Sequence, residues 1–229
     1  MVTYSNHNRF FKRKSSGKYS LDTYELYETF TQISVLEDRI AAFIRERQRA
    51  VMENEFWLNL SALHSILIHI VPLSTFNSQI ENFSSQQLLH LLKNELSVPG
   101  YHSFSYRFCL EGFHNYKSPT TQTIQSYDMV PYNLIFRNGA IETFTNELFF
   151  SGDIQKPNLY DKRFLDILNE QLRKALTLYP KVSIDFPFYL SIKLNNTNNM
   201  GMVNESKNTM VGDRFNSNSI QLPIVLLTD

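Results

Sequence analysis

Two stretches decide the fold class of this chain: LHSILIHIVPLS at residues 63–74 and YNLIFRNGAIETF at residues 132–144. The first is rich in Ile, Leu and Val, is too short for a typical helix and reaches Pro72, so it predicts a largely buried strand. The second has two strand-like runs on either side of Asn138-Gly139, a dipeptide that favours the two positive-φ positions of a type I′ turn. Together they predict a central sheet that contains a β-hairpin.

Helical periodicity precedes these strands. Residues 8–13 are typical of a strand, and Ser20 is a good N-cap for a helix that follows a short turn. That helix would carry an aromatic face formed by Tyr24, Tyr27 and Phe30. A separate second helix is predicted over residues 36–52, and its apolar stripe also includes Arg47.

The C-terminal part of the chain favours one more helix and further strands. Residues 161–179 have the clearest helical period, which ends at Pro180, and residues 188–194 are typical of a strand. Asparagine fills 8 of the 24 positions from 195 to 218, which predicts a long surface connection. We therefore predict an α+β or mixed α/β fold, with a central sheet, a β-hairpin and packed helices.

Composition excludes several classes of protein. The 229 residues are 42% hydrophobic and 14% aromatic, which is ample for a globular core and is not typical of a disordered chain or a coiled coil. The 22 basic and 22 acidic residues balance, so binding to nucleic acid would need a local patch. A single cysteine excludes an intrachain disulfide framework. The sequence has no secretory signal or membrane-spanning stretch that we recognise, so we expect a cytoplasmic protein without a membrane partner.

Motifs for catalysis, metals and cofactors are weak. Cys109 lies in an aromatic-rich strand and is expected to pack, and the six histidines lack metal-ligand spacing. Phosphate-binding glycine loops are missing, so we predict no catalytic residue, no metal site and no cofactor. Glu142 is expected on the solvated surface. An enzyme would become the better hypothesis if Glu142, His114 and Arg137 met in one deep cleft.

The local charge of residues 1–18 departs from the global balance. This stretch has no Asp or Glu and holds five basic residues, namely Arg9, Lys12, Arg13, Lys14 and Lys18. Phe10, Phe11 and Tyr19 are interleaved with them. Basic and aromatic side chains in one segment suit contact with phosphates and unstacked bases. The alternative is an edge strand that Lys and Arg guard against aggregation.

Several blocks of the sequence resemble a known family. NRFFKRKSSGKYSLDTYELYETF, residues 8–30, is similar to the closing strand and following helix of the AlbA-like DNA-binding domain of bacterial Schlafen-type proteins. Further blocks resemble, in the same order, the region that follows this domain: DRIAAFIRERQRAV, LHSILIHIVPLSTF, YNLIFRNGAIETF and SNSIQLPIVLLTD. The resemblance implies that residues 1–35 are the C-terminal remnant of an AlbA-like domain and that residues 36–229 form a C-terminal mixed α/β domain.

This resemblance also implies a function. The family's acidic and lysine residues for nucleotide or nuclease chemistry would lie upstream of residue 1, so we expect a non-catalytic accessory domain. DNA or RNA phosphates would contact the basic segment at Arg9, Lys12, Arg13, Lys14, Ser16, Gly17 and Lys18. The alternative is a protein-interaction module that makes no direct contact with nucleic acid. It would dock onto an upstream AlbA-like domain or a second copy of itself through Tyr24, Tyr27 and Phe30.

Overall fold

The computed structural model describes the backbone of residues 2–4, 7–14, 17–20, 23–53, 64–76, 89, 95–99, 105–117, 131–146, 149–150 and 157–228, and within these ranges the side chains from residue 34 onward except 149 and 150. The chain divides into two compact units, residues 1–43 and 44–229. The boundary falls within α1 (Thr23–Met52). Residues 23–52 contain neither Pro nor Gly, so nothing interrupts the helix, and the prediction of two separate helices here is wrong.

The first unit contains a small antiparallel sheet ahead of α1. Its strands are β1 (Val2–Tyr4), β2 (His7–Lys14) and β3 (Gly17–Ser20), in the order β1-β2-β3. The strand predicted over residues 8–13 corresponds to β2. Ser20 pairs with Phe11 at the end of β3, so the helix start that we predicted at Ser20 is wrong.

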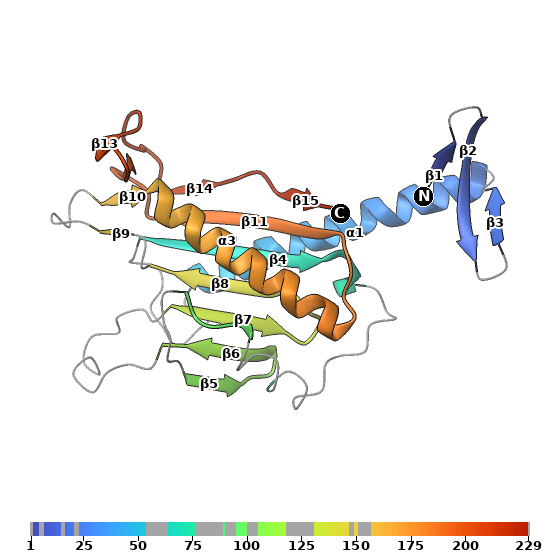
Figure 1. Cartoon of the computed structure of the whole chain (residues 1–229), viewed down its shortest axis with the longest axis horizontal. Helices are drawn as coiled ribbons and strands as arrows, with labels where there is room; N and C mark the ends of the chain where they lie inside the picture. The colour runs from blue at the N-terminus through green and yellow to red at the C-terminus, as the bar shows by residue number, and fades with distance from the viewer. Residues whose placement is uncertain are drawn as a thin grey trace. The chain divides into compact units, whose positions relative to one another are not determined.

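The second unit is built on a large antiparallel sheet (Figure 1). Within the described residues it has eight strands, in the order β14-β11-β4-β8-β7-β6-β5, and β15 also pairs with β11. Their bounds are β4 (Ser65–Pro72), β5 (Ser105–Phe108), β6 (Gly112–Tyr116), β7 (Tyr132–Phe136), β8 (Ile141–Thr145), β11 (Phe188–Asn195), β14 (Ser219–Gln221) and β15 (Val225–Leu227). All eight residues of β4 are buried, and a 3-10 turn, η1 (Leu73–Phe76), follows it. The sheet and its helices confirm the predicted α+β fold.

The β7–β8 hairpin is present, but its turn differs from the predicted type. Gly139 has a φ of 86°, whereas Asn138 is not among the residues with positive φ, so the turn is not type I′. The Gly139 N–H donates to the Phe136 carbonyl and the Phe136 N–H donates to the Ala140 carbonyl. This pattern is a three-residue connection that closes on a left-handed glycine.

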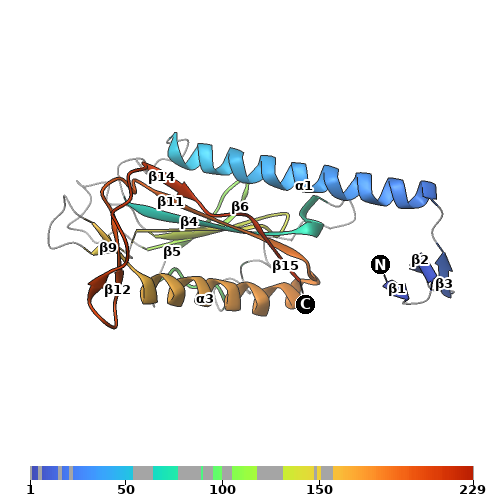
Figure 2. The same cartoon turned by 90° about the horizontal axis from the view of Figure 1, so that it is seen from above.

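Helices cover both faces of the large sheet (Figure 2). On one face lies α3 (Asp161–Leu178), which is followed by the 3-10 turn η2 (Tyr179–Val182). Residues 44–52 of α1 lie on the other face. The main core lies between α3 and the sheet and comprises Ile66, Ile68, Ile70, Leu96, Phe113, Ile135, Ile141, Leu159, Ala175, Leu178, Tyr179, Ile184, Phe188, Leu190, Ile192, Leu194 and Met200. Burial of these side chains is the main stabilising contribution in this unit.

A second, smaller sheet lies beside the start of α3. It has the order β13-β12-β10-β9, from β9 (Phe149–Phe150), β10 (Asn158–Tyr160), β12 (Gly201–Asn204) and β13 (Thr209–Met210). The asparagine-rich segment 195–218 is therefore not only a connection. Asn196, Asn199 and Asn208 adopt positive φ, a conformation that asparagine tolerates better than most residues. Among the described residues, no helix is long and apolar enough to cross a bilayer.

Candidate functional site

The basic residues of the N-terminal segment lie on two paired strands, which we call the basic hairpin (β2 and β3). Arg9, Lys12, Arg13 and Lys14 belong to β2, while Gly17 and Lys18 begin β3. The pairing sets Arg13 opposite Lys18, Lys12 opposite Tyr19 and Lys14 opposite Gly17. Residues directly opposite in an antiparallel pair share a face, so Arg13 and Lys18 occupy neighbouring positions on one side of the sheet.

The remaining predicted interaction residues divide between described and undescribed parts of the chain. Ser16 lies outside the described residues. Tyr24, Tyr27 and Phe30 lie in the first turns of α1, where the structure describes the backbone only. Their spacing of three residues places all three positions along one side of the helix.

A buried charge cluster lies between the C-terminal part of α1, residues 44–52, and the large sheet. Its centre is Glu142 on β8, whose side chain is 0% exposed. Arg47 on α1 donates through Nε to Oε2 at 3.0 Å and through Nη2 to Oε1 at 3.2 Å. Tyr132 donates its hydroxyl to Oε1 at 2.9 Å, and His69 Nε2 lies 3.1 Å from Oε2. Four contacts therefore satisfy both oxygens of the carboxylate.

Strand register explains why these groups meet. His69 on β4 is directly opposite Glu142 on β8, and Glu142 is opposite Leu134 on β7. Leu134 is in turn opposite His114 on β6, so the row crosses four neighbouring strands on the face that α1 covers. Tyr132 lies two residues before Leu134 on the same strand and reaches Glu142 diagonally.

The environment of the cluster keeps Glu142 ionised. Burial alone would raise the pKa of this carboxyl, but the hydrogen bond and charge of His69 and the guanidinium of Arg47 outweigh it and lower the pKa from 4.5 to about 2. Burial also opposes the charge of Arg47, and Glu142 overcomes it, so the pKa of Arg47 is raised. The pKa of Tyr132 is raised well above 10, first by burial and then by the Glu142 charge. The cluster is thus a carboxylate–guanidinium pair with two neighbouring hydrogen-bonding groups.

Two further residues extend the cluster toward the edge of the sheet. Arg47 Nη1 donates to Glu111 Oε1 at 2.9 Å, and Arg107 Nε donates to His114 Nδ1 at 3.2 Å. His114 packs edge-on against Tyr132, with ring centroids 4.9 Å apart. Burial, followed by the charge of Arg107, lowers the pKa of His114 from 6.5 to about 4. His114 is therefore neutral at neutral pH.

The contacts of this cluster hold residues 44–52 of α1 against the large sheet. Glu142 was expected on the solvated surface, and that prediction is wrong because β8 lies inside the sheet with both faces covered. Arg137 lies at the hairpin turn, where its Nε donates to the Leu110 carbonyl at 3.0 Å. Glu142, His114 and Arg137 therefore do not line one deep cleft. Cys109 follows β5, is half-buried and donates weakly to the Gly112 carbonyl, so the prediction that it packs in the interior is only partly confirmed.

One sequence signal pointed to the cluster. Arg47 falls within the apolar stripe of its helix, and a cation in such a stripe needs a buried anion. The partner is 95 residues away, and a single sequence gives no means of selecting it among 22 acidic residues.

Comparisons with known proteins give no relative for this chain. No family model matches it, and no curated protein or solved structure matches it either. The resemblance to Schlafen-type proteins therefore rests on the quoted sequence blocks.

Proposed function

We propose that this chain is a non-catalytic accessory part of a Schlafen-type, AlbA-like nucleic-acid-binding protein of the cytoplasm, and that its basic hairpin contacts phosphates. The observation that carries the proposal is the pairing of Arg13 with Lys18. Like charges directly opposite each other destabilise a sheet. An anion bound over this pair would offset the repulsion, and a nucleic-acid backbone supplies closely spaced anions.

The rest of the hairpin supports the same ligand. Lys12 is opposite Tyr19, and Phe10 and Phe11 lie in the same strand, so cationic and aromatic residues occupy neighbouring positions over a short distance. Bases can stack on aromatic rings while basic groups contact the backbone. Because the net charge of the chain is zero, attraction to nucleic acid would come from a local patch such as this segment and not from the whole molecule.

Charge reversal in the hairpin tests the proposal. The full chain would be titrated, with fluorescence anisotropy as the readout, into labelled single-stranded DNA, duplex DNA and RNA, each about 16 nucleotides long. Lys12→Glu/Arg13→Glu/Lys14→Glu should lose binding. Lys162→Glu/Arg173→Glu/Lys207→Glu makes the same change in net charge at exposed positions of the second unit and should retain it. An equal loss in both variants, or no binding by the wild type, would contradict the proposal.

A second candidate is a module that docks onto an upstream AlbA-like domain or a second copy of the chain. The observation that favours it is the size of the first unit, residues 1–43. A unit of this size is close to the lower limit of about 40 residues at which a core can support itself without a partner. Light scattering of the full chain would show a dimer that Tyr24→Ala/Tyr27→Ala/Phe30→Ala dissociates, whereas a wild-type monomer that binds no added partner would exclude this candidate.

A further inference from the structure

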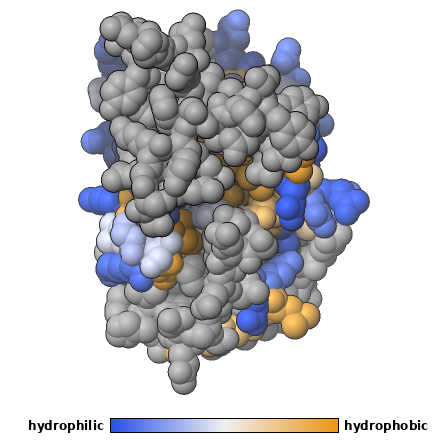
Figure 3. All heavy atoms as spheres, turned by 90° about the vertical axis from the view of Figure 1, so that its right-hand side faces the viewer, coloured by the Kyte–Doolittle hydropathy of each residue, from blue (hydrophilic) through white to orange (hydrophobic). Residues whose placement is uncertain are grey.

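Exposed apolar side chains gather at β5, the last strand in the described order of the large sheet. Tyr106 is 41% exposed, Phe108 44% and Leu110 94%. Leu110 follows the end of β5, and we call Tyr106 and Phe108 the aromatic edge. Figure 3 looks at the end of the sheet where β5 and β7 finish and shows hydrophobic atoms at the surface low in the view. Large apolar side chains on an edge strand are unusual unless they bind something.

The two rings are held in place before any ligand arrives. Phe113, on the neighbouring strand β6, is buried and lies directly opposite Phe108. The Tyr106 ring stacks beside Phe113, with centroids 5.5 Å apart and planes 20° apart. Phe108 contacts Phe113 edge-on at 5.1 Å. A ligand would therefore meet rings whose freedom is already restricted, which reduces the entropy lost on binding.

The spacing of the rings selects among ligands. Tyr106 and Phe108 are alternate residues of one strand, so their Cα atoms lie about 6.7 Å apart. This separation is about twice the 3.4 Å rise per nucleotide in a duplex strand. Neighbouring bases can reach both rings only if the strand is extended and its bases are unstacked.

The charge around the aromatic edge also suits a nucleic acid. Arg137 is anchored beside Leu110 by a hydrogen bond from its Nε to the Leu110 carbonyl. Arg107, which stands between the two aromatic residues in the sequence, lies on the opposite face of β5, where it donates to His114. The only acidic residue from 105 to 117 is Glu111, and Arg47 pairs with it at 2.9 Å. A docked polypeptide is the weaker alternative because β5 has four residues and offers few main-chain hydrogen bonds for strand addition.

We propose that the aromatic edge is a stacking platform for unstacked bases of a single-stranded nucleic acid. This inference rests on the proposed function, since it assigns the strand form of the nucleic acid and a base-contacting surface on the second unit.

The test separates bases from phosphates. The full chain would be titrated with a labelled oligothymidylate of about 16 nucleotides, its duplex, and an abasic strand of the same length. The wild type should bind the oligothymidylate at least about tenfold more tightly than the abasic strand, because each of two stacked bases contributes about fivefold or more. Tyr106→Ala/Phe108→Ala should remove most of this difference and leave binding of the abasic strand unchanged.

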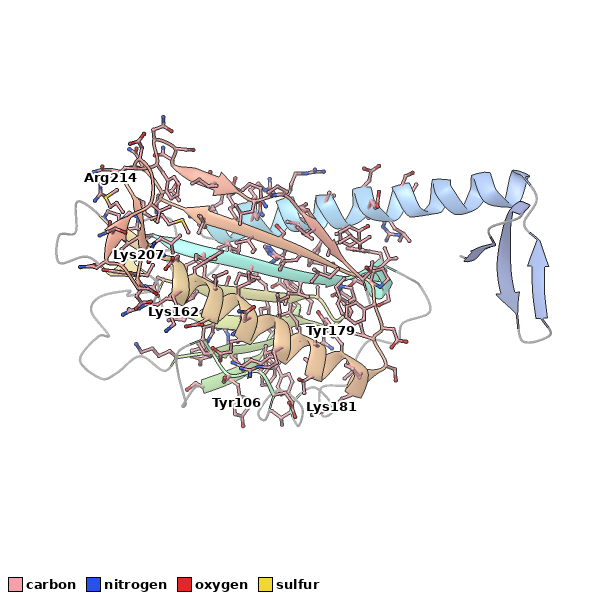
Figure 4. All side chains as sticks on the ribbon, turned by 45° about the horizontal axis from the view of Figure 1, so that its top comes forward. Tyr106, Lys162, Tyr179, Lys181, Lys207 and Arg214 are labelled. Carbon is pink, nitrogen blue, oxygen red and sulfur yellow. The ribbon has the colours of Figure 1, made fainter. Side chains whose placement is uncertain are left out.

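Two controls make the result decisive. Tyr106→Phe/Phe108→Tyr keeps both rings and should bind as the wild type does, with thermal unfolding followed for every variant. Lys162→Glu/Arg173→Glu/Lys207→Glu is the second control. Lys162 and Lys207, two of its three positions, lie near the start of α3, whereas Tyr106 lies on the lowest strand (Figure 4). Loss of oligothymidylate binding only in the alanine variant supports the inference.

The contrary outcomes are distinct. If the alanine variant binds the oligothymidylate as tightly as the wild type does, the stacking platform is overturned and the basic hairpin proposal stays intact. No binding of any nucleic acid by the wild type would overturn both proposals. A change from dimer to monomer in the alanine variant, without an effect on nucleic-acid binding, would assign the aromatic edge to a protein contact and overturn the inference.

Discussion

Arg47 of α1 and Glu142 of β8 form a buried bidentate ion pair, with contacts of 3.0 and 3.2 Å. Their side chains are 9% and 0% exposed. The pair fixes the position of residues 44–52 against the sheet, because α1 must place one guanidinium over one carboxylate. Gln48 adds a hydrogen bond to Gln221 at 2.8 Å on the same face. The docking of this part of α1 thus depends on specific polar contacts as well as on apolar burial.

Removal of the Arg47 guanidinium should destabilise the protein strongly. Arg47→Met leaves a buried carboxylate without its cation, a change that typically costs about 3–5 kcal/mol. The free energy of unfolding from urea denaturation measures the loss. Arg45→Met changes an exposed arginine on the same helix and should have little effect. If Arg47→Met and Arg45→Met unfold at the same urea concentration, the buried pair has no structural importance.

Glu142→Gln should change how stability depends on pH. The folded-state pKa of Glu142 is about 2 against an ordinary value of 4.5, so its ionisation stabilises the fold above pH 4.5, and this contribution disappears as the pH falls toward 2. The difference of about 2.5 units corresponds to about 3 kcal/mol. Urea denaturation from about pH 7 to pH 3 should show the wild type losing its advantage over Glu142→Gln. A constant difference across this range would be inconsistent with an ionised Glu142.

His114 should contribute a separate loss of stability in weak acid. Its pKa is lowered from 6.5 to about 4, so the neutral form stabilises the fold above pH 6.5, and the contribution declines as the pH falls toward 4. His114→Asn keeps an acceptor for Arg107 but cannot titrate, so its stability should fall less over this range. Equal slopes in wild type and His114→Asn would refute the assignment.

Gly112 is required by close approach of two strands. A Cβ at this position would lie 1.8 Å from the Ile135 carbonyl oxygen, which is backbone and cannot rotate away. Gly112→Ala should therefore lower the free energy of unfolding by at least about 1–3 kcal/mol, the usual cost of overpacking. Gly212→Ala is the matched control, because nothing lies within 4 Å and only its φ of 71° is unfavourable. If Gly112→Ala lowers the free energy of unfolding less than Gly212→Ala does, the close approach of Gly112 to the Ile135 carbonyl is contradicted.

The sequence predicted the fold class because local patterns determined its main elements. The apolar run around Ile66 and Ile68 gave β4, and the period of residues 161–178 gave α3. Asn138-Gly139 located the hairpin but not its turn type, since the register of Phe136 with Ala140 selects a longer connection. Two apolar stripes predict two helices where the structure has the single helix α1, because a stripe does not show whether the backbone continues into the next one.

The buried cluster could not be assembled from the sequence. Glu142 lies in a strand whose two faces are both buried. The alternation of polar and apolar residues along the sequence does not show that other elements cover both of these faces. Strand order brings His69 beside it, and order depends on long-range packing that local patterns do not encode. For the basic hairpin, the sequence supplied the charges, and the structure supplied the register of Arg13 and Lys18.

The salt dependence of nucleic-acid binding tests the central proposal most directly. The affinity of the full chain for a labelled single strand would be measured between about 50 and 200 mM salt, for the wild type and for Lys12→Glu/Arg13→Glu/Lys14→Glu. With up to five phosphate contacts, the wild-type plot of log K against log salt should have a slope approaching about −3.5. The variant should bind more weakly and with a slope closer to zero. Affinity that does not change with salt, or a slope that the variant leaves unchanged, would contradict phosphate contact by the basic hairpin.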